Sequence, residues 1–217
     1  MMRSVRVIVS IVAVAGMLLA ATGQSAHSQT AGPNPAKVDE LKMALRDLYV
    51  NHVFWVRSLV IATRFREKTA VSEADEYGVK NANAIGHSIA PFYGQAAGAK
   101  FATLFVGHYS AVKEYMKGAF ANNFKGDAAL KKAAVDKLTA NANAIAAFVS
   151  SANPNLPKAT VYGLLVAHAG QHMAAIDAAA KKDWSAEADG WDPMVKHIYM
   201  LSDALAAGIA KQFPNKF

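Results

Sequence analysis

The pentapeptide Asn-Ala-Asn-Ala-Ile occurs twice in this chain, at residues 81–85 and 141–145. At the same offset, His108 in one apolar segment matches His168 in another, without an insertion or deletion. A repeat in register indicates an internal duplication, in which one copy alone cannot bury its apolar face. We therefore expect two halves, at about 36–123 and 127–213, that pack against each other.

Apolar side chains recur at alternating steps of three and four residues, which places them on one stripe of a helix. Such stripes predict helices at about 36–67, 72–90, 95–122, 128–150, 158–181 and 193–212, with Asp127 as the N-cap of the fourth and a loop at 184–190. No segment alternates apolar and polar residues as a half-buried strand does. The predicted fold class is all-α, an antiparallel helical bundle of about six helices with an internal pseudo-twofold three-helix repeat.

Residues 1–28 have the pattern of a secretory signal peptide. Two arginines precede an apolar run at 7–21, and small residues suited to a cleavage site follow it. An uncleaved membrane anchor is the alternative, although the run is short for a spanning helix. We expect a flexible leader at 29–35, one bundle domain at 36–217, and a periplasmic or secreted protein without stable membrane insertion after cleavage.

Composition and motifs exclude several classes of function. The chain carries a formal net charge of +7, but its lysines are scattered, and it has no cysteine for disulfides or a lipid anchor. Scattered lysines are typical of solvated helix faces, so we expect no nucleic-acid partner. The sequence contains no phosphate loop or nucleotide fingerprint, and its helix stripes lack the glutamates of a di-iron site. A non-enzymatic role is therefore favoured, although the sequence leaves open whether a reaction is catalysed, and no protein partner is identified.

Four helix stripes carry one histidine each: His52, His108, His168 and His197. A buried imidazole without partners costs on the order of 1–3 kcal/mol, so four of them indicate a shared use. Imidazoles that converge in a bundle form a transition-metal site suited to Zn, Cu or Fe. For one ion we expect imidazole separations of about 3–5 Å, because Zn–N bonds are about 2.0–2.1 Å long. The predicted function is metal binding in a carrier, sensor or redox role.

Five further residues are candidates for contacts around these ligands. His172 lies one helical turn after a ligand candidate and is either a fifth ligand or a hydrogen-bond donor to the ligands. Asn81 and Asn141 are poor residues for a helix interior, which indicates buried hydrogen bonds to backbone or contact with the metal. Arg57 and Asp203 lie at stripe edges, where they could pair across the bundle, or Arg57 could face an anionic ligand.

Two alternatives to metal binding remain open. In the first, the protein is an interaction module, and its histidines and asparagines form a buried polar network that fixes the register of the helices. In the second, the bundle binds haem.

Several motifs extend over nearly the whole chain after the leader. Residues 52–57 read His-Val-Phe-Trp-Val-Arg, residues 91–94 read Pro-Phe-Tyr-Gly, and residues 208–214 read Gly-Ile-Ala-Lys-Gln-Phe-Pro. With the four histidines, they resemble a bacterial family of small, mostly uncharacterised helical-bundle proteins whose first helix carries His-Val-Tyr-Trp-Thr-Arg. The resemblance implies the bundle and the histidines, and no established activity. Glutamate often precedes these histidines in the family, whereas Asn51, Gly107 and Ala167 stand here.

Overall fold

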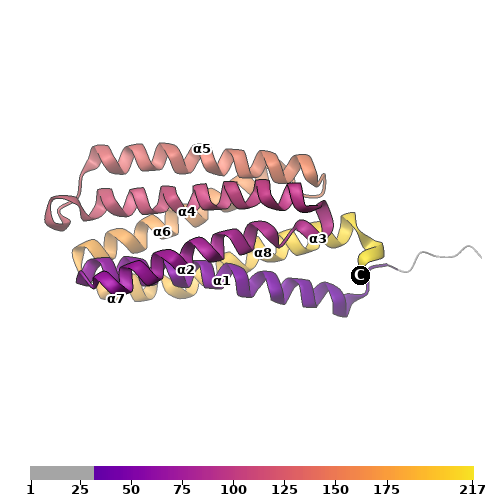
Figure 1. The fold of residues 1–217 in the computed structure, drawn as a ribbon, viewed down its shortest axis with the longest axis horizontal. Helices are drawn as coiled ribbons and strands as arrows, with labels where there is room; N and C mark the ends of the chain where they lie inside the picture. Colours follow the sequence, from indigo (N-terminus) through magenta and orange to yellow (C-terminus); the bar gives the residue numbers. More distant parts are fainter. Residues whose placement is uncertain (1–31) are drawn as a thin grey trace, which may run out of the picture. The chain divides into compact units, whose positions relative to one another are not determined.

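The computed structural model describes residues 32–217, and all regular structure in this range is helical (Figure 1). The long helices are α1 (Pro35–Phe65), α2 (Lys68–His87), α4 (Gln95–Phe124), α5 (Ala128–Ala152), α6 (Lys158–Lys181) and α8 (Trp191–Gln212). Shorter elements are α3 (Ala90–Tyr93), α7 (Trp184–Asp189) and the 3₁₀ turn η1 (Pro214–Lys216). The predicted all-α class and the six long helices are confirmed.

The long helices form a closed ring of neighbours in the order α1, α2, α4, α5, α6 and α8, which returns to α1. In addition, α6 contacts both α1 and α4 across the interior. Short connections make helices that follow each other in the chain antiparallel, as Figure 1 shows for α4 and α5. Helices α1, α4 and α6 therefore point the same way and meet at the centre of the bundle. The pseudo-twofold relation between two halves stays a prediction.

The core is built from side chains of all six long helices. Tyr49, Phe101, Tyr109, Ile145 and Ile198 are among the largest fully buried side chains. Each large apolar side chain contributes roughly 1.5–3 kcal/mol by leaving water, so this core is the main source of stability.

Side chains cap the N-termini of α5 and α7, and of these two helices the sequence predicts only α5. Asp127 Oδ1 accepts hydrogen bonds from the first backbone N–H groups of α5, at 2.9 and 3.0 Å, which confirms the predicted N-cap. Of residues 184–190, predicted as a loop, residues 184–189 form α7 instead. Asp183 Oδ1 accepts from Ala186 N at 3.1 Å, and α7 packs on α6. A cap and a tertiary contact, rather than apolar periodicity, stabilise this short helix.

Among the helices of residues 32–217, none has the length and apolar character that crossing a membrane requires. The predicted signal peptide, its anchor alternative and residues 29–31 of the leader fall outside the described residues. Of the rest of the leader, Pro35 is the first residue of α1. Export and a periplasmic or secreted location therefore stay predictions.

Candidate metal centre

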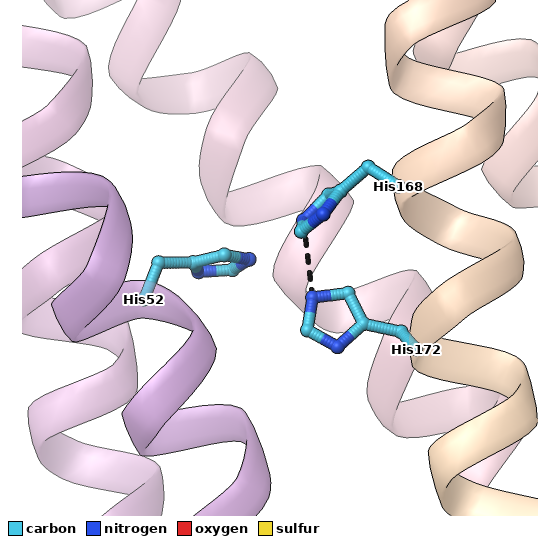
Figure 2. Close-up of side chains that lie close together, drawn as sticks. All are labelled: His52, His168 and His172. Atoms are coloured by element: carbon cyan, nitrogen blue, oxygen red, sulfur yellow. Dashed lines mark hydrogen bonds between the residues drawn. The ribbon is translucent and has the colours of Figure 1, made fainter. Parts of the chain in front are cut away.

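Three buried histidines converge in the interior of the bundle. Figure 2 shows His52 from α1 pointing between His168 and His172, which both come from α6. One ring nitrogen of each residue lies within 4.8 Å of the other two. The three residues are only 1%, 3% and 3% exposed. These separations fall in the range of about 3–5 Å that we expect for ligands of one ion.

A hydrogen bond joins the two histidines of α6. Nε2 of His168 and Nε2 of His172 lie 3.0 Å apart, so one ring donates the proton and the other accepts it (Figure 2). Two neutral imidazoles can share a proton in this way, because each has one N–H and one lone pair. A metal ion at this point would take the place of the shared proton.

His108 of α4 adds a fourth ring to the cluster. Its ring centroid lies 5.9 Å from that of His52 and 5.8 Å from that of His168, and those two are 5.7 Å apart. Both ring nitrogens of His52, both of His108, and Nδ1 of His168 are buried without a hydrogen-bond partner in the described part of the chain. Five such atoms in one place carry a considerable desolvation cost unless something binds them.

Burial keeps these imidazoles neutral. It lowers the pKa of His108 to about 4, although the nearby Asn141 amide opposes the change. It also lowers the pKa of His172 to about 3, and that of His52 and His168 well below the usual 6.5, with further lowering from the neighbouring rings. At neutral pH the lone pairs of the rings are therefore free to bind a metal ion.

The helices that carry the central histidines are tied to their neighbours in one recurring way. In each case, the carbonyl of the leucine one turn before the histidine accepts a side-chain hydrogen bond of 2.9 Å from an adjacent helix. The donors are Asn81 to Leu48, Asn141 to Leu104, and His197 to Leu164. These bonds confirm backbone contact for both asparagines. The Oδ1 atoms of both are buried and have no hydrogen-bond partner among residues 32–217.

His197 differs from the other predicted ligands. Its ring lies parallel to that of His168 at 6.2 Å, but its Nε2 donates to the Leu164 carbonyl. The structure thus brings His52, His108 and His168 together, adds His172, and gives His197 a backbone partner. A ligand role for His197 stays a prediction.

Arg57 and Asp203, the two charged candidates, each pair with a different residue and not with each other. Arg57 binds Glu187 through two hydrogen bonds of 2.5 and 2.8 Å, and Asp203 binds Arg46 at 2.7 and 2.5 Å. The direct pairing of Arg57 with Asp203, considered from the sequence, is therefore absent. The pairing does not form because α7 places the nearly buried Glu187 carboxylate beside Arg57.

A cavity of about 30 Å³ adjoins the cluster. Its lining includes the buried His172, the Arg57–Glu187 pair, the half-buried Trp191 and the exposed Gly190. The lining thus includes both a buried histidine of the cluster and an exposed glycine. A second cavity of about 30 Å³ is lined by apolar side chains and contains no histidine.

Sequence reasoning gave too little weight to two residues. His172 was considered only a secondary candidate, although its spacing of four residues from His168 places both rings on one helix face. Glu187 was missed, because the helix that presents it was expected to be a loop. A further signal was available in three similar segments, Leu48–His52, Leu104–His108 and Leu164–His168, which share the pattern Leu, apolar, Val, any residue, His.

No family model matches this chain, and comparison with curated proteins and with solved structures gives no match either. The resemblance to a bacterial helical-bundle family stays a prediction, and the function is argued from the geometry of the site.

Proposed function

We propose that this protein binds a transition-metal ion in the core of its bundle, through His52, His168 and His172, with His108 as a fourth ligand. The observation that carries the proposal is that one ring nitrogen each of His52, His168 and His172 lies within 4.8 Å of the other two. His108 is added because its ring lies 5.9 and 5.8 Å from those of His52 and His168. A set of imidazoles without thiolate or carboxylate suits Zn, Cu, Ni or Fe. The low pKa values of His108 and His172 favour the neutral, metal-binding form of the ligands.

The location of the site indicates its consequences for the protein. Its ligands come from three helices that meet at the centre of the bundle, so a bound ion cross-links α1, α4 and α6. An ion that binds only the folded chain adds to its stability, by about 3 kcal/mol at a concentration 100 times its dissociation constant. We propose a carrier, sensor or redox role in an exported protein, and export rests on the N-terminal sequence alone.

An interaction module with a purely structural polar network is the second candidate. The hydrogen bonds of Asn81 and Asn141 to neighbouring helices support a role in helix register. Such a network is stabilising only when its members are satisfied, and the nitrogens of His52 and His108 are not. Haem finds less support, because the cavity beside His172 measures about 30 Å³, against roughly 300–1,000 Å³ for ordinary small-molecule sites.

The contacts also bear on the repeat. We propose that the bundle consists of three related helix pairs, α1 with α2, α4 with α5, and α6 with α8. The first helix of each pair supplies one central histidine, and the second donates a side-chain hydrogen bond to the first. The nearly equal ring separations of 5.7, 5.8 and 5.9 Å support this threefold relation over a twofold one.

Metal binding is tested on protein purified without an affinity tag. Metal content is measured first, and then the affinities of the apoprotein for Zn²⁺ and Cu²⁺ by calorimetry. His52→Leu, His168→Leu and His172→Leu are each expected to weaken binding on the order of 100-fold, which corresponds to about 3 kcal/mol. His197→Gln is the matched control, since it changes a neighbouring histidine whose ring already has a backbone partner.

Three results would count against the proposal. They are no binding of either metal above background, a melting temperature that Zn²⁺ leaves unchanged, and a loss of affinity in His197→Gln as large as that in His172→Leu. The first two would favour the structural network, and the third would move the site toward α8.

A further inference from the structure

Among the described residues, the histidine cluster contains no anionic ligand that could compensate the charge of a bound ion. In the part of the chain that the structure describes, the group of side chains close enough to share an ion consists of histidines alone. These neutral imidazoles leave both charges of a divalent ion uncompensated in a buried site. Charge buried without compensation is costly, because the surroundings cannot replace the solvation that water provides.

One carboxylate lines the cavity beside His172, and it is already paired. Glu187 lines the cavity beside His172, but both of its oxygens accept hydrogen bonds from Arg57. Since no carboxylate of the described residues joins the cluster, we expect a small external anion to neutralise the ion.

The cavity beside His172 offers the route. It is the place where a cluster histidine and an exposed residue, Gly190, line the same space. Its volume of about 30 Å³ has room for one or two water-sized groups, and not for a larger organic ligand. Arg57 adds a positive charge to this lining, while valine, isoleucine and methionine side chains keep the remainder apolar.

From these observations we propose that the metal centre takes a small exogenous anion as an additional ligand, and that the anion enters through the cavity beside His172. The inference rests on the proposed metal binding. The chemical class is a monovalent anion of two or three atoms, which lowers the net charge of the ion and fits the space. The Arg57–Glu187 pair at the cavity controls how strongly anions are attracted.

The test uses the full chain loaded with Co²⁺, whose visible absorption reports on its ligands, and azide as the probe. Azide is expected to change the spectrum in a saturable way. Ala175→Leu fills the cavity beside His172, and Ala204→Leu fills the second, apolar cavity. The first is expected to weaken azide binding at least about tenfold, the effect of roughly 1.4 kcal/mol of steric cost, and the second to leave it unchanged.

Glu187→Gln provides a test that does not depend on packing. It keeps the shape of the side chain and removes a negative charge from the cavity, so azide is expected to bind several-fold more tightly. Circular dichroism and Co²⁺ affinity establish that each variant is folded and loaded.

The outcomes separate the two proposals. Failure of Co²⁺ to bind overturns the metal centre and this inference with it. Normal Co²⁺ binding with a spectrum that azide does not change overturns the inference alone. Equal effects of Ala175→Leu and Ala204→Leu, or weaker azide binding in Glu187→Gln, overturn the assignment of the route.

Discussion

The metal-free bundle is expected to lose stability on mild acidification, because its central histidines stay neutral when folded. Burial lowers the pKa of His108 to about 4 and that of His172 to about 3, whereas in the unfolded chain both titrate near the ordinary value of about 6.5. Below pH 6.5 the unfolded chain thus binds more protons than the folded one. The free energy of unfolding therefore falls as the pH falls through this range.

The size of the effect follows from the two pKa values. Between pH 7.5 and pH 5.5, a histidine that titrates only in the unfolded chain lowers the free energy of unfolding by roughly 1–2 kcal/mol. His108 and His172 together give about 3 kcal/mol, and His52 and His168 act in the same direction. Since domains of this kind are stable by about 5–15 kcal/mol, the loss is a large share of the total.

The assay is urea unfolding at pH 7.5, 6.5 and 5.5 in the presence of EDTA. His172→Leu is expected to reduce the loss between the two ends of this range by roughly 1–2 kcal/mol. His87→Leu, which changes an exposed histidine, serves as the control and is expected to keep the wild-type pH dependence. The change with pH is the readout, because leucine also alters packing. An identical pH dependence in His172→Leu and in the wild type would refute the reasoning, since it would mean that folding does not disfavour protonation of His172.

Two further predictions concern stability away from the cluster. Arg57→Met is expected to cost about 2 kcal/mol in urea unfolding, because it leaves the Glu187 carboxylate, 5% exposed, without its partner. Glu187→Gln is expected to cost about 1 kcal/mol, since the amide oxygen can still accept from Arg57, and equal losses in the two variants would contradict this asymmetry. Gly86→Ala is expected to lower the melting temperature strongly, because its Cβ would lie 2.1 and 2.2 Å from backbone atoms of Ala102. Gly170→Ala in α6 is the control, because nothing lies within 4 Å of its added Cβ. It is expected to stabilise the protein by up to about 1 kcal/mol. A similar loss of stability in the two variants would contradict the close approach of α2 and α4.

The six long helices could be predicted from the sequence because their information is local. Apolar side chains spaced by three and four residues fix which face of each helix is buried, and the Asp127 cap fixes where α5 begins. Helix α7 could not be predicted in this way. It has six residues, too few to show a period, and depends on the Asp183 cap and on packing against α6.

The residues of the site could be predicted from the sequence only in part, because they depend on which hydrogen-bond partners lie near each imidazole ring in the folded chain. His168 and His197 look alike in sequence, each in an apolar stripe. In the structure, the Leu164 carbonyl accepts a hydrogen bond from His197, while Nδ1 of His168 finds no partner in the described part of the chain. The same limit applies to Arg57, whose partner lies in a segment without helical periodicity. Spacing along a helix predicts a shared face, but not which backbone oxygen of another helix lies opposite.

His172 is the residue that most separates a metal centre from a structural network. Under the threefold relation, His52, His108 and His168 have equivalent places, and three rings in a closed interior would suffice to fix helix register. His172 has no counterpart in the other two helices, where Val56 and Val112 stand four residues after the histidine. If the histidines only fixed the register of the helices, a further buried imidazole on one helix alone would have no purpose. An additional metal ligand gives such a reason, because His172 lies beside the cavity through which we propose that an anion reaches the ion. The one position that departs from the threefold relation is then the position that serves metal binding.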